Sequence, residues 1–270
     1  MNSVQFEQSL LKRENLDTVE GAFEYKAGRE LTKPGLRMRE RIQIELIGEE
    51  GKAIRWYLKR YGRRPFIKRL LDWFIGTGRV SPARREYENI ARLASIGVPT
   101  MRVITWGEDR DLLGAGRSYI IVSAVPGEAL ERCFEDYLVK ISDDADAMKR
   151  FNRALVDIVR KLHEHGFVHR DLYASHIFLN PTPDGPELYL IDLARVFSPV
   201  RWRRFRWRVK DLAELKYSMP AAWVDKFWDD FLGMYLREGE SFSKWSRAID
   251  RKVAWMRRRN HRRSKAKKVQ

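Results

Sequence analysis

Two carboxylates, Asp171 and Asp192, lie 21 residues apart, and each follows or adjoins a short apolar segment of the kind found in strands. Phosphoryl transfer uses such a pair, because one carboxylate accepts a hydroxyl proton and the other holds the metal ion that bridges the nucleotide phosphates. His176, five residues after Asp171, stands where a second metal-side ligand would fall. The structural alternative is an ordinary acidic turn between a helix and a hairpin, and the combined spacing argues against it.

The elements that must position these residues begin with a β-rich half. Alternating apolar and polar residues predict a strand over 41–47, and the tight connection after it predicts that 53–61 is a second strand and forms a hairpin with the first. A third strand is predicted over 118–125. A helix is predicted to begin at Ser81, a capping residue followed by proline, and to stop at Gly97. This half therefore combines strands with one main helix.

Helical periodicity dominates after the break at Pro126-Gly127. Asp143 or Asp144 is predicted to cap a helix that ends at Gly166, and a hairpin over 177–193 follows the candidate catalytic loop. The buried stripe of that helix is predicted to be Phe151, Leu155, Ile158, Val159 and Leu162. We thus expect an α+β fold of four parts: an arm (1–15), a β-rich N-lobe (16–125), a helical C-lobe (126–255) and a basic tail (256–270).

The charge of the chain is unevenly distributed. The formal net charge is +16 over 270 residues. Three stretches that are rich in Lys and Arg and contain no acid account for this excess: 55–69, 195–210 and 251–268. Such patches indicate an anionic partner, whether nucleic acid, acidic lipid headgroups or a phosphorylated or carboxylated substrate, although any one of them could be only a solvated face.

The remaining composition predicts a soluble protein of a reducing compartment. The single cysteine, Cys133, has no partner for an internal disulfide. The first fifteen residues lack the pattern of a signal peptide. No apolar stretch approaches the ~20 residues of a spanning helix. A cytoplasmic location is therefore expected.

Three segments carry a resemblance to a known family. They are His169-Arg170-Asp171-Leu172-Tyr173-Ala174-Ser175-His176, Leu190-Ile191-Asp192-Leu193-Ala194-Arg195 and Val209-Lys210-Asp211-Leu212-Ala213. On these residues, across roughly 16–220, the chain resembles the protein-kinase-like superfamily. Within it the chain looks most like the WaaP-type lipopolysaccharide kinases, which phosphorylate heptose or Kdo of the lipid A–core. The resemblance implies a protein-kinase-like bilobal fold.

The resemblance also implies roles for the residues of the loop. Asp171 would be the catalytic base, and Asp192 would bind Mg²⁺. His176 stands where kinases usually have Asn, so it would ligate the metal or instead orient Asp171 or a phosphate. A zinc site formed with His169 is a minor alternative. Asp211 is expected to cap a helix and to tie down the loop through Arg170.

Nucleotide binding is assigned by the same resemblance. Lys59, late in its strand, would be the phosphate-binding lysine, and Glu86 on the following helix would be its partner, with Glu88 as second choice. The loop from Gly28 to Gly35 would cover the phosphates through backbone amides, although it lacks the usual glycine pattern.

The acceptor is the least defined part. Only eighteen residues lie between Asp192 and Asp211, too few for a regulated segment that would hold an extended peptide. The arginine-rich stretch in that interval could bind phosphate or carboxylate and stack on sugars, or its aromatic residues could simply pack inward. We predict substrate contacts from Arg201, Arg204 and Trp207.

These patterns together predict an ATP- and Mg²⁺-dependent kinase that phosphorylates a sugar hydroxyl of lipopolysaccharide core or a similar glycolipid. The basic carboxyl end of the chain, with Trp255 and Met256 among its Arg and Lys residues, is predicted to contact the anionic cytoplasmic face of the inner membrane, or else to be a disordered tail. The alternatives are a nucleic-acid-associated protein with a degenerate kinase-like fold, and a kinase with a small-molecule or protein acceptor. Nucleic acid is the less favoured partner.

Overall fold

The computed structural model describes residues 3–31, 39–48, 51, 53–63, 80–111, 114–141 and 144–268. The chain divides into two compact units. The first comprises residues 1–92 and 101–124, and the second comprises residues 93–100 and 125–270. Each unit is described by itself.

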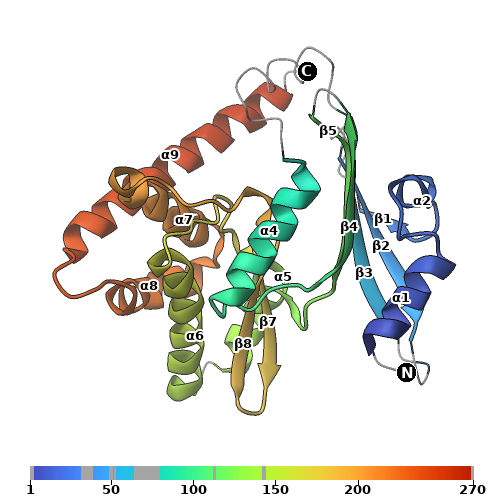
Figure 1. The fold of residues 1–270 in the computed structure, drawn as a ribbon. Coiled ribbons are helices and arrows are strands. Elements are labelled where there is room, and N and C mark those ends of the chain that lie inside the picture. The colour runs from blue at the N-terminus through green and yellow to red at the C-terminus, as the bar shows by residue number, and fades with distance from the viewer. Residues whose placement is uncertain are drawn as a thin grey trace. The chain divides into compact units, whose positions relative to one another are not determined.

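The first unit contains an antiparallel sheet of five strands in the order β1-β2-β3-β5-β4 (Figure 1). The central strand, β3, pairs with β2 and with β5, and Lys59 lies opposite Arg41 on one side and Ile120 on the other. The predicted hairpin is therefore present, and β4 is a strand that the sequence pattern did not predict. The bounds are β1 Arg29–Glu30, β2 Arg39–Ile47, β3 Ala53–Tyr61, β4 Val103–Asp111 and β5 Gly114–Ser123.

One face of this sheet forms an apolar core with two short helices, α1 (Ser3–Arg13) and α2 (Val19–Glu24). Side chains alternate between the two faces of a strand. Trp56 and Leu58 of β3 point into this core, and Lys59 and Tyr61 therefore lie on the opposite face of the sheet. Leu10 of α1 is only 2% exposed. The amino-terminal segment, expected to be a poorly anchored arm or a short helix, is thus a helix that packs into the core of the first unit.

The main helix of the first unit, α4 (Pro82–Ser95), begins where the sequence predicts. The Ser81 hydroxyl accepts a hydrogen bond from the Arg84 backbone amide at 3.1 Å, so it satisfies an amide that lacks a helical partner. This cap fixes the first turn of α4, and Glu86 lies in the turn that follows.

The core of the second unit is built on α6 (Ala145–Glu164), which has Asp144 as its N-cap. All five residues of the predicted stripe are buried. Phe151 packs against Phe134 of α5 (Leu130–Lys140), with ring centroids 4.6 Å apart, and against Trp223 of α8 (Ala221–Tyr235). The helix α5 was not predicted from the sequence.

A three-stranded sheet and two long helices complete the second unit (Figure 1). Strands β7 (Ile177–Thr182) and β8 (Gly185–Leu190) form the expected hairpin, and β6 (Glu128–Ala129) pairs with β7. The second strand of the hairpin ends at Leu190 instead of Leu193, because residues 193–195 form a 3₁₀ turn after Asp192.

Helix α7 (Arg204–Ser218) packs along α9 (Phe242–Lys268). A 3₁₀ turn, Arg201–Arg203, leads into α7. The basic segment from Arg251 onward is therefore helical as far as Lys268 and not a disordered tail, and the buried side chains of Ile249, Val253 and Met256 pack the first part of α9 against the rest of the unit. None of the helices in the described part of the chain has the length and apolar character that crossing a membrane requires.

Candidate active site

The loop that carries Asp171 is held by hydrogen bonds from α7. The buried carboxylate of Asp211 accepts from the backbone amide of His169 at 2.6 Å and from that of Arg170 at 2.9 Å. Lys210 donates to the carbonyl oxygen of Arg170. Asp211 thus ties down the loop through Arg170, as predicted, but it does so from inside α7 and not as a helix cap.

The same helix also holds the second half of this loop. Glu214 accepts from the Leu172 amide at 3.3 Å, and the Ser218 hydroxyl accepts from the Ala174 amide at 2.8 Å. Amides on both sides of Asp171 are therefore fixed by one rigid element. Such support reduces the freedom of the loop and preorganises its carboxylate.

Two residues of the site have left-handed backbone conformations. Arg170 has φ of 72° and Asp192 has φ of 59°. Non-glycine residues seldom adopt this region, and each such residue costs on the order of 1 kcal/mol, so the surrounding structure must enforce it. For Arg170 the enforcing contacts are those from Lys210 and Asp211.

The carboxylate of Asp171 is paired with Arg195, which lies three residues after Asp192. Arg195 Nη1 lies 2.8 Å from Oδ1 and 2.8 Å from Oδ2 of Asp171. Tyr173 occupies the position where the resemblance to kinases would place a lysine near the base. A cation from a different segment therefore lies beside the carboxylate and limits its rotation.

Asp192 and His176 lie together on the other side of the loop. His176 Nδ1 is 2.7 Å from the carbonyl oxygen of Asp171, and because a carbonyl only accepts, Nδ1 is the donor. In the neutral imidazole the lone pair is then on Nε2, which lies 3.8 Å from Asp192 Oδ2. That separation is too long for a hydrogen bond, but it suits two ligands of one cation.

This donor set fits a magnesium ion that takes its other ligands from nucleotide phosphates and water. Among the residues that the structure describes, no group of three or more His, Cys, Asp or Glu side chains is arranged to hold a metal. The zinc alternative has little to support it, because His169 is fully buried and its Nε2 donates to the Ile191 carbonyl at 3.0 Å. Burial lowers the pKa of His169, so its imidazole is neutral.

The Ile191 backbone connects the loop of Asp171 to the segment of Asp192. Its amide donates to the carbonyl oxygen of His176 at 3.0 Å, and its own carbonyl accepts from His169. Asp192 follows directly, so its position is set relative to the loop of Asp171.

In the first unit the structure brings Lys59 and Glu86 together. Lys59 Nζ contacts Glu86 Oε1, and Tyr61 donates to Glu86 Oε2 at 2.7 Å. The side chains of Lys59 and Glu86 are 8% and 0% exposed. Glu88, the second choice, instead pairs with Arg84 and Arg92 on the surface of α4.

Of the two glycines predicted to cover the nucleotide phosphates, the structure describes only Gly28. Gly28 has φ of 101°, and a Cβ atom there would lie 2.5 Å from the Gln43 carbonyl oxygen. The close approach of the chain to β2 therefore explains this glycine without a ligand. Gly35 lies outside the described residues.

The three predicted substrate residues differ in their surroundings. Trp207 packs edge-on against Phe197 at 5.1 Å and lies under the Arg170 guanidinium, as the inward-packing alternative expects, although it also lines a pocket. Arg201 and Arg204 are exposed and do not line that pocket.

Several residues that hold the loop of Asp171 were not predicted from the sequence. Arg195, Lys210, Glu214 and Ser218 reach the loop across 24 to 44 residues of chain. The one available signal was the spacing on α7, because residues 210, 211, 214 and 218 recur at three- and four-residue intervals along one helical face.

The fold and this arrangement define a phosphotransferase with a kinase-like architecture. A solved structure described as WaaP in complex with acyl carrier protein is similar to this chain, with a TM-score of 0.64 and 26% identity; the match covers 95% of this chain and 97% of that one. The predicted α+β, protein-kinase-like fold class is thereby confirmed.

Sequence comparisons identify the family. The lipopolysaccharide core heptose(I) kinase WaaP of Escherichia coli K12 is 30% identical over 214 residues, covering 75% of this chain and 78% of that protein. WaaP of Pseudomonas aeruginosa is 32% identical over 145 residues, or 50% of this chain and 52% of the relative. The family profile named lipopolysaccharide kinase (Kdo/WaaP) matches residues 36–235, and the chain belongs to this family.

Proposed function

We propose that this protein transfers the γ-phosphoryl group of ATP to a sugar hydroxyl, on heptose or Kdo, of lipopolysaccharide core. The observation that best supports the proposal is the presence of two side-chain pairs in the second unit. There the Asp171 carboxylate is held by Arg195, and Asp192 faces the free nitrogen of His176. A protein that only binds needs neither arrangement, and relatives carrying the name heptose(I) kinase share the family.

In this proposal Asp171 is the catalytic base. It accepts the proton of the acceptor hydroxyl as that oxygen bonds to the γ-phosphorus, while the bond from phosphorus to the bridging oxygen breaks and ADP leaves. The carboxylate needs a fixed direction for this task, and Arg195 with the α7 contacts supplies it. Most of the catalysis is positioning and charge stabilisation.

Asp192 and His176 would hold Mg²⁺, which when bound neutralises charge on the nucleotide phosphates. Lys59, fixed by Glu86, is assigned to the phosphates of ATP. The loop from Gly28 to Gly35 stays a prediction for the cover of the nucleotide.

We test the proposal by transfer of label from γ-labelled ATP into purified core glycolipid, followed by mapping of the labelled hydroxyl. The wild-type protein is expected to label a core sugar, whereas Asp171→Ala and Asp192→Ala abolish transfer and keep their circular dichroism. Retained turnover in either variant would rule out its assigned role. Labelling of an aminoglycoside or a protein, and not of the glycolipid, would show that the acceptor is a different molecule.

The nucleic-acid alternative is tested in parallel. Binding to RNA that weakens steeply with salt, and that Asp171→Ala does not change, would support it if no glycolipid were labelled. The Lys59–Glu86 pair and the Asp192–His176 pair give such a protein no advantage.

We further propose that the protein works at the cytoplasmic face of the inner membrane. In support, the segment before α7 exposes apolar side chains among arginines: Val200 is 58% and Trp202 75% exposed, beside Arg201 and Arg203. Such a mixture suits an anionic lipid surface. Cosedimentation with anionic vesicles, lost in Trp202→Ala and absent with neutral vesicles, is the expected result.

A further inference from the structure

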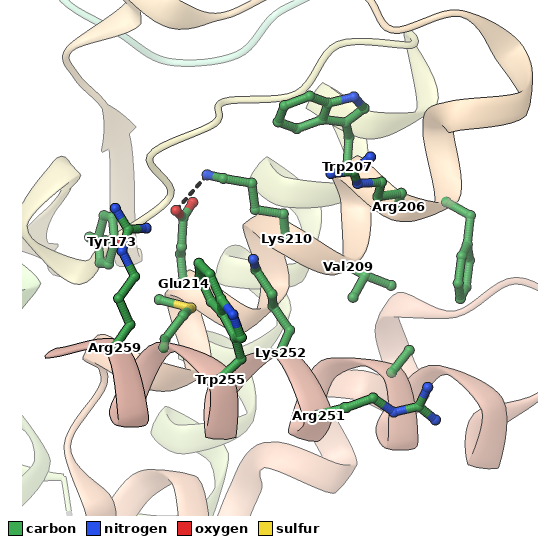
Figure 2. A pocket seen from close by; sticks show the side chains of 13 residues that line it. Tyr173, Arg206, Trp207, Val209, Lys210, Glu214, Arg251, Lys252, Trp255 and Arg259 are labelled. Atoms are coloured by element: carbon green, nitrogen blue, oxygen red, sulfur yellow. Dashed lines mark hydrogen bonds and ion pairs between the residues drawn. The ribbon is translucent and has the colours of Figure 1, made fainter. Parts of the chain in front are cut away.

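A pocket of about 770 Å³ lies between α7 and α9 in the second unit. Its wall includes Tyr173, so it opens beside the loop of the proposed base (Figure 2). Tyr173 follows Asp171 by two residues, which limits their Cα atoms to about 7 Å apart. The volume is in the usual range for a site that holds a small molecule.

The pocket is strongly cationic. Five basic residues line it: Arg206 and Lys210 from α7, and Arg251, Lys252 and Arg259 from α9. Glu214 is the one carboxylate among the lining residues, and it pairs with Lys210. Within the described ranges the other four cations form no ion pair, so Glu214 is shared by five cations and leaves an excess of positive charge in the pocket.

These cations also disfavour one another. Partial burial lowers the pKa of Lys252, and the nearby charges of Lys210, Arg206 and Arg259 lower it further, against an opposing effect of Glu214. Lys252 lies over the ring of Trp255, with Nζ 3.8 Å from the ring centroid. Holding like charges together costs free energy, and an anionic ligand would remove that cost.

The aromatic part of the wall suits a sugar better than a bare ion. Trp255 is 48% exposed and Phe205 37% exposed, and both line the pocket. A flat ring presents a large apolar surface, which can pack against the C–H face of a sugar while the cations bind its acidic groups. A site for a simple anion would not need this surface.

Two residues of the pocket also hold the backbone of the loop that carries Asp171. Lys210 donates to the Arg170 carbonyl, and Glu214, one turn later on α7, accepts from the Leu172 amide. These two residues therefore contact the backbone on either side of Asp171 and line the pocket as well. A ligand that occupies the pocket is thus held by the element that positions the base.

We propose that the α7–α9 pocket binds a phosphate or carboxylate group carried by the acceptor glycan and so orients the hydroxyl at Asp171. The proposal rests on the sugar-kinase function proposed above and adds to it the place where the acceptor is recognised. It assigns acceptor binding to α9, whose Arg251, Lys252 and Arg259 are the recognition residues, in place of Arg201 and Arg204.

The experiment measures binding of core oligosaccharide, released from its lipid, to the full chain by calorimetry without ATP. The native oligosaccharide is compared with one whose phosphates are removed and whose carboxylates are reduced. The wild type is expected to prefer the native form by at least about tenfold. The variant Arg251→Gln/Lys252→Gln is expected to lose this preference.

A matched control is available on the same helix. Arg257 and Arg258 are exposed on α9 and do not line the pocket, so Arg257→Gln/Arg258→Gln makes the same change of net charge. This variant is expected to keep the preference. Equal losses in both variants would show general electrostatic attraction and would overturn the proposal, as would no loss in the first.

Folding is checked by the thermal midpoint. Because Lys252 is repelled by its neighbours, the Arg251→Gln/Lys252→Gln variant is expected to be at least as stable as the wild type, a result that a merely structural role would not give. If that variant does not fold, Arg259→Gln, at another exposed lining position, carries the test.

Further outcomes separate this proposal from its rivals. Inorganic phosphate or single-stranded RNA that binds the pocket cations as tightly as the oligosaccharide would overturn it. If Arg251→Gln/Lys252→Gln transferred phosphate with an unchanged acceptor KM, the proposed kinase function would stand, but the proposed role of the pocket in acceptor binding would be wrong. Selective binding of the native oligosaccharide without any phosphoryl transfer would support the pocket and contradict the proposed kinase function.

Discussion

The guanidinium of Arg195 contacts both carboxylate oxygens of Asp171, each at 2.8 Å. The contact joins the loop of the proposed base to the segment that follows Asp192, the proposed metal ligand. Ion pairs this exposed add little stability, and the Arg195 side chain is 51% exposed. Its value is therefore expected to lie in the direction it gives to the carboxylate.

Arg195→Ala is expected to lower kcat about 100-fold with little change in the KM for ATP, because a base misplaced by about 1 Å loses that much rate. Arg195→Lys, which keeps the charge, should recover part of the loss. Steady-state kinetics with core glycolipid measure both. Arg237, a similarly exposed arginine paired with Glu164, gives the matched control Arg237→Ala. An unchanged kcat in Arg195→Ala would contradict the positioning role.

Nucleotide binding is expected to depend on Mg²⁺ through Asp192. At a ligand concentration of about 100 Kd, binding stabilises a protein by about 2.7 kcal/mol. The thermal midpoint should therefore rise with ATP and Mg²⁺ together, and chelation with EDTA should remove the increase. In Asp192→Asn, the part of the midpoint increase that depends on Mg²⁺ is expected to be lost.

His176 allows a sharper version of the same measurement. His176→Asn offers an amide oxygen, which Mg²⁺ accepts more readily than imidazole, so it should keep the midpoint increase that His176→Ala loses. Equal increases in all three proteins would show that His176 does not face the metal.

The Lys59–Glu86 pair is expected to matter for stability as well as for ATP. Breaking a buried ion pair by removing one partner costs about 3–5 kcal/mol, so Glu86→Gln should lower the free energy of unfolding by that order and raise the KM for ATP. Tyr61→Phe removes only the 2.7 Å hydrogen bond to the same carboxylate and should cost about 1 kcal/mol. Urea unfolding measures the difference, and similar losses in the two variants would contradict the expectation.

Much of the framework around these residues was predictable from local sequence. The alternation of 41–47 and the tight connection after it predicted the hairpin whose second strand, β3, carries Lys59. The Ser81-Pro82 start predicted the helix of Glu86. All of these signals depend on neighbours in the chain. The spacing of Asp171 and Asp192 likewise indicated phosphoryl transfer.

The contacts that complete the site were not predictable in this way. Arg195 reaches Asp171 only because a 3₁₀ turn redirects the chain after Asp192, whose own backbone is left-handed. The basic composition of 256–270 suggested a tail, since composition does not reveal that the helix α9 continues to Lys268. Strand β4 was missed because its second half is polar.

Glu214 gives the stability of the protein a specific dependence on pH. Burial raises its pKa to about 7 from the ordinary 4.5, and the charges of Asp211 and Asp171 add to this, whereas Lys210 opposes it. Between these two pH values the folded state holds a proton that the unfolded state has lost. The stability contribution is therefore full below about pH 4.5 and declines as the pH rises to about 7.

Glu214→Gln is expected to remove that decline, which for this nearly buried group amounts to about 3 kcal/mol. The measurement is the free energy of unfolding across pH 4.5–7 for wild type and variant. Glu238→Gln removes one charge at an exposed position and serves as the control. Parallel curves for the wild type and Glu214→Gln would show that Glu214 does not titrate in this window.

The division of labour between α7 and α9 bears on how this enzyme could diversify. In the part of the chain that the structure describes, α9 makes no hydrogen bond to residues 169–176, whereas α7 makes several. If the α7–α9 pocket binds the acceptor as proposed, substitutions on α9 are expected to alter which glycan is preferred while the chemistry stays intact. Related enzymes with new acceptors should differ first along this outer helix, and an engineer who wants a new specificity should begin there.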